Sequence, residues 1–282
     1  MPIDPAIVGA EPKPVAFKFE ERDTILYALG VGAGADAADL KFTTESNLTA
    51  LPTFGVIPPF KALMGLLEVP GLDINLVMLL HGEQYLEIKK DPLPVKGSLI
   101  SKPKIAALYD KGKGALVELD VETVDEDDEP VFFNKFSLFI RGEGGFGGER
   151  GPEPGNEPPA REPDKVVEIK TLPQQALIYR LSGDLNPLHS DPAIATMAGY
   201  DRPILHGLCT FGVAGKAVLQ AYCDNDPTLF RAMKVRFSRH VFPGETIVTE
   251  MWQTAPDTVI IRCKAAERDE YCLTNSAVWI NA

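Results

Sequence analysis

The chain has 282 residues, of which 45% are hydrophobic and 24% charged, so it has the composition of a globular protein with a substantial core rather than of a disordered chain. Its formal net charge of −12 would repel nucleic acids and anionic membranes, and we expect neither as a partner. The sequence shows no secretory signal and no apolar run of membrane-spanning length, and its last residues, from Trp279 to Ala282, lack a Ser-Lys-Leu-type peroxisomal signal. We therefore expect a cytoplasmic protein.

The first segment with a clear pattern, residues 24–29, is apolar and fits either a strand or a helix. Gly30, Gly32 and Gly34 follow it. Their spacing departs from the GxGxxG pattern of dinucleotide-binding proteins, and no alternation of strands and helices surrounds them. A loop between helices is the better interpretation, and we expect no nicotinamide cofactor.

An apolar segment at residues 51–69 begins with the letters LPTFGV and predicts a buried helix. Four strand-like runs follow it, at residues 85–89, 98–109, 115–124 and 131–140. Residues 142–163 are rich in glycine, proline and charge, which no helix or central strand tolerates. We therefore expect this segment to be a linker.

The second half repeats the same order of elements. Residues 208–222 begin with LCTFGV and predict a second buried helix, and strand-like runs follow at 232–239, 246–253, 258–265 and 271–280. A helix followed by several antiparallel strands is typical of an α+β unit in which a sheet wraps round the helix. The repeat predicts two such units, residues 1–141 and residues 164–282, on either side of the linker. An ordinary two-domain α+β protein is the alternative.

The cysteines at positions 209, 223, 263 and 272 occur singly, without a CxxC pair and outside any secretory context. Zinc sites and disulfide frameworks need paired cysteines or an oxidising compartment. We therefore expect reduced, partly buried thiols, and no metal.

The densest cluster of reactive and turn-forming residues has the sequence SGDLNPLH. Its glycine, asparagine and proline predict a bent loop that can direct Asp184 and His189 at one point, with Asn186 offering a donor and an acceptor beside them. A carboxylate and an imidazole that converge on one water can accept its proton and return a proton to a neighbouring carbon, as hydration of a conjugated double bond requires. The alternative is structural: Asp184 and Asn186 cap a turn, and backbone groups satisfy His189.

A second cluster, PILHGLCTFG, places Gly207 where the second buried helix begins. Free N–H groups at a helix N-terminus form a site for negative charge. During conjugate addition to a thioester the carbonyl oxygen becomes an enolate-like anion, so the Gly207 N–H is a candidate oxyanion donor. The alternative is a glycine needed only for close packing.

The stretches YRLSGDLNPLHSDPAIA and PILHGLCTFG resemble the signature of the hydratase 2 family, the (R)-specific enoyl-CoA hydratases of the MaoC-like hot-dog group. The likeness extends over almost the whole chain, through RDTILYALGVG, LHGEQY and GGFGG. It includes the hydratase portion of peroxisomal multifunctional enzyme type 2 and bacterial stand-alone two-domain 3-hydroxyacyl-thioester dehydratases. The resemblance implies a double hot-dog fold, with the chemistry in the second hot-dog and a first hot-dog that has lost it and accommodates long acyl chains. The implied reaction is reversible hydration of a trans-2-enoyl-CoA to a (3R)-3-hydroxyacyl-CoA in fatty-acid metabolism.

The resemblance also implies roles for single residues. Asp184 and His189 are the implied catalytic pair, Asn186 assists them, and Gly207 is the implied oxyanion donor. Matching positions imply substrate contacts at His81, Gly82, Lys111 and Phe237; Glu45 matches a family glutamate important for activity, and Tyr27 lies in a similarly matched segment. The first half contains no DxNPxxH motif, which agrees with one active site per chain.

Coenzyme A carries several phosphate charges, so an acidic chain needs a local basic patch to bind it. The most basic run spans residues 231–240, and on a strand Lys234, Arg236 and His240 would share one face. Lys111, on a predicted turn, could add a further charge. A solvated sheet face is the alternative for each residue. No separate cofactor is expected, because coenzyme A is part of the substrate.

Other functions remain open at this point. A metal-dependent hydrolase could use Asp184, His189, Asp191 and His206, although their spacing fits no zinc signature. Thioesterases also use hot-dog folds, so an acyl-CoA thioesterase or a non-catalytic acyl-CoA-binding protein is the alternative within the fold. Two hot-dogs in one chain already reproduce the usual hot-dog pair, so both a monomer and a homodimer are compatible with the sequence.

Overall fold

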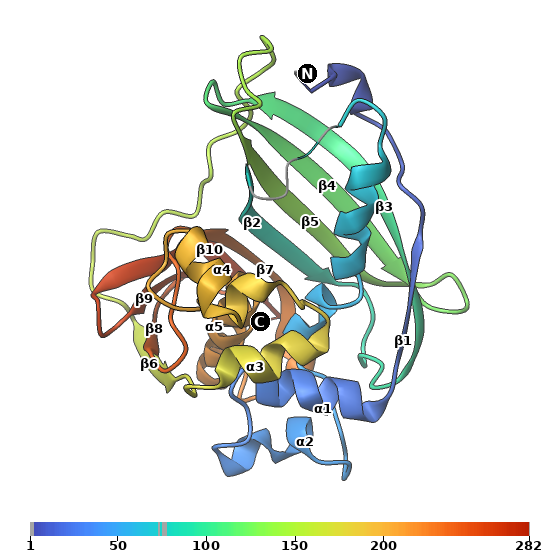
Figure 1. Cartoon of the computed structure of the whole chain (residues 1–282). Helices are drawn as coiled ribbons and strands as arrows, with labels where there is room; N and C mark the ends of the chain where they lie inside the picture. Colours follow the sequence, from blue (N-terminus) through green and yellow to red (C-terminus); the bar gives the residue numbers. More distant parts are fainter. Residues whose placement is uncertain (1–2, 73, 75–77, 282) are drawn as a thin grey trace.

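The computed structural model describes residues 3–72, 74 and 78–281. Within these residues, ten strands form one continuous sheet in the order β1-β3-β4-β5-β2-β7-β10-β9-β8-β6 (Figure 1). All neighbouring strands are antiparallel. No helix in the described residues is long and apolar enough to cross a membrane.

Each half of the chain contributes five strands. They are β1 (Val15–Phe19), β2 (Leu79–Ile88), β3 (Gly97–Asp110), β4 (Gly114–Val124) and β5 (Pro130–Arg141) in the first half, and β6 (Lys165–Lys170), β7 (Phe230–Phe237), β8 (Thr246–Ala255), β9 (Thr258–Ala265) and β10 (Glu270–Ile280) in the second. The eight strands expected from the sequence are confirmed, although β2 begins six residues earlier than expected. The sequence analysis missed β1 and β6, which are the two edge strands, are only five and six residues long, and are largely exposed.

The internal repeat is visible in the strand order. If the five strands of each half are numbered along the chain, their order from the edge of the sheet to its middle is first, third, fourth, fifth, second in both halves. The second strands of the two halves, β2 and β7, therefore meet in the middle of the sheet. There β2 pairs with β7, with Glu83 opposite Arg236 and Leu86 opposite Met233. One hydrophobic core runs through both halves and includes Leu86 and Met233. The expected α+β arrangement with two similar units is therefore confirmed, and main-chain hydrogen bonds join the units.

The central helix of the second half is α5 (Gly207–Tyr222), as the sequence predicted, and its residues 208–219 are all buried. It contacts β6, β7 and β8. A Cβ on Gly212 would lie 2.5 Å from Val31, and a Cβ on Gly215 would lie 2.4 Å from Thr53. These glycines let the first half of the chain approach the helix closely.

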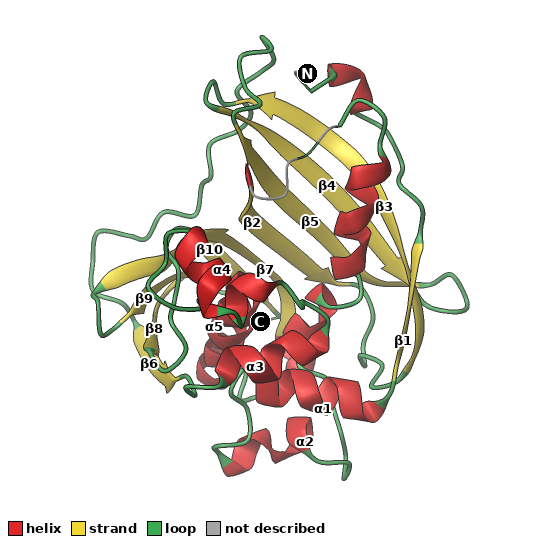
Figure 2. Cartoon of the chain, viewed as in Figure 1, coloured by secondary structure: helices red, strands yellow, loops and turns green. Residues whose placement is uncertain are grey.

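The corresponding segment of the first half is not a single α-helix, and that expectation was wrong. Residues 51–69 form two 3-10 segments, η3 (Pro52–Val56) and η4 (Phe60–Glu68), with Pro58 and Pro59 between them (Figure 2). A proline has no N–H to donate and its ring clashes with the preceding turn, so consecutive prolines interrupt an α-helix. All of η3 is nevertheless buried, whereas η4 buries only Ala62 and Leu66, which belong to a second, smaller core of the first half.

The described residues also form four shorter helices, two in the first half and two in the segment between β6 and α5. They are α1 (Glu21–Gly30), α2 (Leu40–Thr43), α3 (Gln175–Tyr179) and α4 (Pro192–Met197). The amide of the buried Gln175 donates hydrogen bonds to the carbonyls of Leu29 (3.1 Å) and Gly30 (2.6 Å) at the end of α1. The first half thus holds α3, which leads directly into the SGDLNPLH loop (Figure 1).

Residues 142–163 contain no helix or strand and run along the surface. The Asp110 carboxylate accepts the N–H groups of Gly145 (2.9 Å) and Gly147 (2.8 Å), and the Trp252 indole N–H donates to the carbonyl of Arg161 (2.8 Å). The segment is therefore fixed at both ends. All four cysteines are free and buried, as expected.

Candidate active site

The loop between α3 and α5 contains the first candidate residues. After α3 come the 3-10 turn η6 (Arg180–Ser182), a bend at Gly183, and the 3-10 turn η7 (Pro187–His189). Gly183 has a φ of 134°, which a residue without a Cβ adopts most readily. The Asn186 side chain accepts the Leu188 N–H (3.0 Å) and caps η7. Asn186 therefore has a structural role in shaping the loop, whatever it contributes to chemistry.

This loop brings Asp184 and His189 together, and His206 joins them. Each of the three residues offers a nitrogen or carboxylate oxygen, and these atoms all lie within 4.8 Å of one another. His189 and His206 are buried, at 8% and 1% exposure, and Asp184 is half-buried. Asp191, which the metal-hydrolase alternative required, instead caps α4 by accepting the N–H of Ala193 (2.8 Å).

The hydrogen bond of His189 determines which ring nitrogen can act as a base. Nδ1 lies 2.9 Å from the carbonyl oxygen of Ile204. A carbonyl only accepts hydrogen bonds, so Nδ1 carries the proton and Nε2 has a free lone pair. Burial lowers the pKa of His189, while the Ile204 carbonyl and the charge of Asp184 act in the opposite direction. His189 is therefore ready to accept a proton at neutral pH.

His206 is the member of the cluster that sequence reasoning undervalued, since it figured only as a ligand in the metal alternative. Its Nε2 lies 3.1 Å from the backbone oxygen of Asp184, and its ring stacks on that of His189 with centroids 3.8 Å apart. Burial, followed by the neighbouring His189, lowers the pKa of His206 to about 2. The available signal was its position directly before the helix-start glycine.

Gly207 is the first residue of α5, so its N–H has no acceptor within the helix. The N-terminus of this 16-residue helix carries a partial positive charge. A Cβ on Gly207 would lie 3.2 Å from the Phe237 ring, so the absence of a side chain keeps this amide accessible. The geometry suits a donor to a developing oxyanion, next to the Asp184 and His189 pair.

The other expected substrate contacts lie beyond Gly207, on the first half of the sheet. The His81 ring packs against Phe237 with centroids 4.9 Å apart, and burial lowers the pKa of His81 to about 4. Gly82 lies at an irregularity in the pairing of β2 with β5. Lys111 lies on the turn between β3 and β4. This turn is at the same end of the sheet as the start of β2, because Ile140 of β5 pairs with Leu79 at the start of β2 and with Ala115 at the start of β4. Among the described residues Lys111 forms no ion pair.

The basic run of β7 is arranged differently from the expectation. Side chains alternate along a strand, so Arg236 and Lys234 point to the opposite face of the sheet from Phe237. There Lys234 and Arg236 both approach the Glu83 carboxylate, at 3.0 and 3.9 Å. His240 does not share their face, because β7 ends at Phe237. A phosphate contact by Arg236 stays a prediction.

Tyr27 and Glu45 are placed very differently. Tyr27 is fully buried in α1, with its ring 6.0 Å from that of Tyr179, which in turn lies 5.0 Å from His206. Glu45 is exposed after α2 and forms no side-chain hydrogen bond or ion pair with any described residue. The structure therefore connects Tyr27 to the cluster and shows no connection for Glu45.

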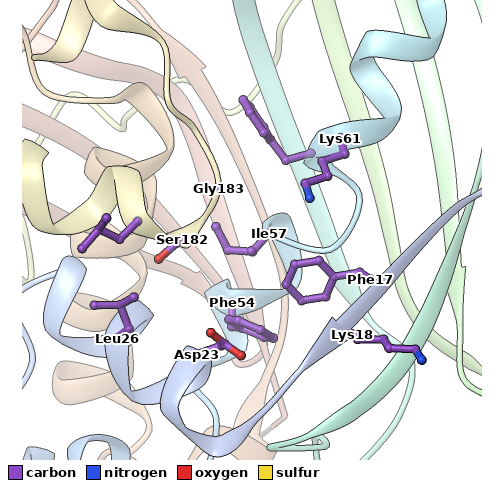
Figure 3. A pocket seen from close by; sticks show the side chains of 11 residues that line it. Phe17, Lys18, Asp23, Leu26, Phe54, Ile57, Lys61, Ser182 and Gly183 are labelled. Atoms are coloured by element: carbon purple, nitrogen blue, oxygen red, sulfur yellow. The ribbon is translucent and has the colours of Figure 1, made fainter.

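A cavity of about 170 Å³ opens beside the loop (Figure 3). Ser182 and Gly183 lie on one side of it and Phe17 on the other. Most of its walls come from the first half and are apolar; the lining residues are Phe17, Lys18, Asp23, Leu26, Phe54, Ile57, Phe60, Lys61, Leu181, Ser182 and Gly183. Gly183 directly precedes Asp184 in the chain, so the cavity reaches the loop that carries Asp184, although neither Asp184 nor His189 lines it.

The glycine-rich segment after α1 is a loop, as the sequence interpretation predicted. Its Gly34 N–H donates to the carboxylate of Asp39 (3.0 Å), which is buried and forms an ion pair with the buried Lys216 of α5 (3.0 Å). The segment therefore closes over this ion pair and acts as a structural loop, in agreement with the sequence interpretation.

The fold consists of two joined hot-dog units, and it brings together a carboxylate and two imidazoles, which are groups suited to acid–base chemistry. Residues 17–142 match the family model of the MFE-2 hydratase 2 N-terminal domain, and residues 155–270 match that of the MaoC like domain. The chain is 45% identical to a protein of Arabidopsis thaliana named "Enoyl-CoA hydratase 2, peroxisomal", over 91% of this chain and 89% of the relative. The chain therefore belongs to the hydratase 2 family of MaoC-like proteins.

Solved structures agree with this assignment. The crystal structure of a MaoC-like dehydratase from Phytophthora capsici superimposes with a TM-score of 0.87 at 36% identity, covering 99% of both chains. A Mycobacterium tuberculosis protein described as having a double hot-dog fold gives a TM-score of 0.55 at 14% identity, covering 96% of this chain and 97% of that one. The second likeness concerns the fold alone. The family and the double hot-dog fold predicted from the sequence are thus confirmed.

Proposed function

We propose that the chain is an (R)-specific 2-enoyl-CoA hydratase and 3-hydroxyacyl-CoA dehydratase, which adds water reversibly to trans-2-enoyl-CoA in fatty-acid metabolism. The observation that carries this proposal is the meeting of Asp184 and His189 beside the N-terminus of α5. The Arabidopsis relative is named for enoyl-CoA hydration and the Phytophthora structure for dehydration, which are the two directions of one reaction.

The reaction needs two proton transfers and one anion-binding group. A water held between the Asp184 carboxylate and Nε2 of His189 gives a proton to this pair while its oxygen attacks C3 of the enoyl group. The π electrons move onto the thioester oxygen, where the Gly207 N–H stabilises the negative charge. The pair then returns a proton to C2, so the hydroxyl ends on C3 and a hydrogen on C2. Dehydration follows the same steps in reverse.

The acyl chain and the coenzyme occupy opposite sides of the pair in this proposal. The apolar cavity beside Gly183 suits the acyl chain, and a cavity of about 150 Å³ is known to hold benzene, so this one accommodates roughly six carbon atoms. His81, Gly82 and Phe237 then face the coenzyme side, and Lys111 offers an unpaired charge to its phosphates. A role for Glu45 stays a prediction of the family resemblance.

The reaction requires no cofactor, since an acid–base pair and an oxyanion donor suffice for water addition. A cytoplasmic location stays a proposal, and the name of the Arabidopsis relative, which includes "peroxisomal", gives the alternative. A homodimer is proposed alongside a monomer, and sedimentation velocity at several concentrations would distinguish them.

The test follows the ultraviolet absorbance of the conjugated double bond in crotonyl-CoA and trans-2-decenoyl-CoA, with chiral analysis of the product. Loss of absorbance with a (3R) product is expected. Release of free coenzyme A would favour the thioesterase, and binding without turnover would favour an acyl-CoA-binding protein. Inactivation by EDTA with recovery on addition of a divalent metal would favour a metal site at Asp184, His189 and His206.

A further inference from the structure

His206 is buried beside the catalytic pair, yet the hydration steps give it nothing to do. It is the last residue before α5 and is 1% exposed. One face of its ring stacks on His189 at 3.8 Å, and the Tyr179 ring lies 5.0 Å away. A polar ring in such a place loses its hydration and needs a compensating role.

The hydrogen bond of His206 fixes its protonation. Nε2 lies 3.1 Å from the backbone carbonyl of Asp184, which can only accept, so Nε2 carries the proton. Nδ1 then holds a lone pair, and it has no hydrogen-bond partner among the described residues. Burial and the adjacent His189 lower the pKa of His206 to about 2, so the ring is neutral at neutral pH. With so low a pKa, Nδ1 is too weak a base to take a proton from water at neutral pH, and the ring acts through the hydrogen bond that Nε2 donates.

The bond matters because the loop that holds Asp184 has few other supports. Within the described part of the chain, the other hydrogen bonds of residues 183–186 are to residues 180–189 of the same segment. Leu185 is 59% exposed, so burial of its side chain contributes little. Among the described residues, the His206 ring is the single side chain from outside this segment that binds the backbone between Gly183 and Asn186.

We propose that His206 is a positioning residue, which fixes the backbone of Asp184 by its Nε2–H and the ring of His189 by stacking, so that both groups reach one water. The proposal rests on the proposed hydratase function. Displacement of a reacting group by about 1 Å can cost roughly 100-fold in rate, so a single bond at this point is enough to affect turnover.

The test compares three substitutions that separate the two nitrogens. In His206→Gln the amide N–H lies close to the position of Nε2, whereas in His206→Asn it lies close to that of Nδ1. His206→Phe keeps the stacking surface and removes both nitrogens. The Gln variant keeps the donor but loses the stacked ring, so we expect it to lose kcat by less than about tenfold, whereas the Asn and Phe variants lose roughly 10- to 100-fold, with KM for crotonyl-CoA changed much less.

Two further measurements separate positioning from other roles. The pH profile of kcat/KM should keep the same acid limb in the Gln variant, because the neutral ring does not titrate. A missing limb would make His206 an acid–base group and overturn the proposal, as would full activity of the Phe variant or equal activities of the Gln and Asn variants.

A measurement that does not depend on catalysis tests the proposal even if a variant fails to fold or the wild type does not hydrate crotonyl-CoA. Nitrogen NMR of the wild-type imidazoles should show His206 neutral and protonated at Nε2. A ring protonated at Nδ1, or charged at neutral pH, would overturn this inference whatever the activity. An inactive wild type with the expected tautomer would instead contradict the proposed function.

Discussion

The substitution Asp184→Asn isolates the charge of the catalytic carboxylate from its structural contacts. Asp184 Oδ1 accepts the N–H of Asn186 (3.1 Å), and the oxygen of an asparagine amide can accept the same bond. The contact with His206 uses the backbone oxygen, which the substitution leaves in place. The loop should therefore keep its shape, and only the ability to accept and return a proton is lost.

The expected loss in kcat follows from the loss of this single proton-transfer group. One general acid–base group contributes roughly 100- to 10,000-fold in rate, or about 3 to 5 kcal/mol of transition-state stabilisation. The Gly207 N–H and the substrate contacts are unchanged, so KM should move much less than kcat. Initial rates with crotonyl-CoA, measured from the loss of enoyl absorbance over a range of substrate concentrations, give both constants.

A matched control lies seven residues away along the chain. Asp191 accepts the N–H of Ala193 (2.8 Å) as the cap of α4, and asparagine caps a helix about as well as aspartate. Asp191→Asn should therefore keep near-normal kcat. The assignment of Asp184 is refuted if Asp184→Asn retains turnover within about threefold of wild type, or if the two variants lose the same amount.

Three other expectations follow from the geometry. Burial lowers the pKa of His189 below the ordinary 6.5, so kcat/KM for crotonyl-CoA should stay level as the pH falls through 6.5 and decline only below it; an acid limb above 6.5 would contradict this reading. Lys216→Met leaves Asp39 buried without its ion-pair partner, and urea denaturation should show a free energy of unfolding about 3 to 5 kcal/mol lower, whereas a change under about 1 kcal/mol would argue against a buried pair. Gly207→Ala brings a methyl group to 3.2 Å from Phe237, beside the oxyanion donor. We expect kcat/KM to fall about tenfold, which is less than the roughly 100-fold loss expected when a donor is deleted. Unchanged kinetics would show that this amide does not face the substrate.

The segments that could be read from the sequence are those in which a local pattern determines the structure. The strand at 258–265 and the helix at 208–222 have clear apolar patterns of strand and helix length, and both were found within one residue of their predicted bounds. The SGDLNPLH loop contains its own turn-forming residues, so its bend could also be read directly. Local pattern failed at residues 51–69, where Pro58 and Pro59 divide an apolar run into two 3-10 segments.

The tertiary structure decided which residues meet across the two halves. Pairing of β2 with β7, burial of Lys216 against Asp39, and the fixing of α3 by α1 all join residues more than a hundred positions apart, which no periodicity encodes. The same holds for Arg236, whose charge could be read from the sequence but whose pairing with Glu83 could not.

For the active site itself, the sequence by itself determined the residue types and the bend that Asp184 and His189 need, because these depend on neighbours within a few positions. The tertiary structure alone placed His206, from the start of the next helix, against the backbone of Asp184 and the ring of His189. The contribution of His206 to the site depends on its contact with Asp184, which lies 22 positions away in the chain. This contact forms because α5 is buried in the core that both halves share. A motif gives the identity of a catalytic group, whereas its position follows from packing of the whole chain.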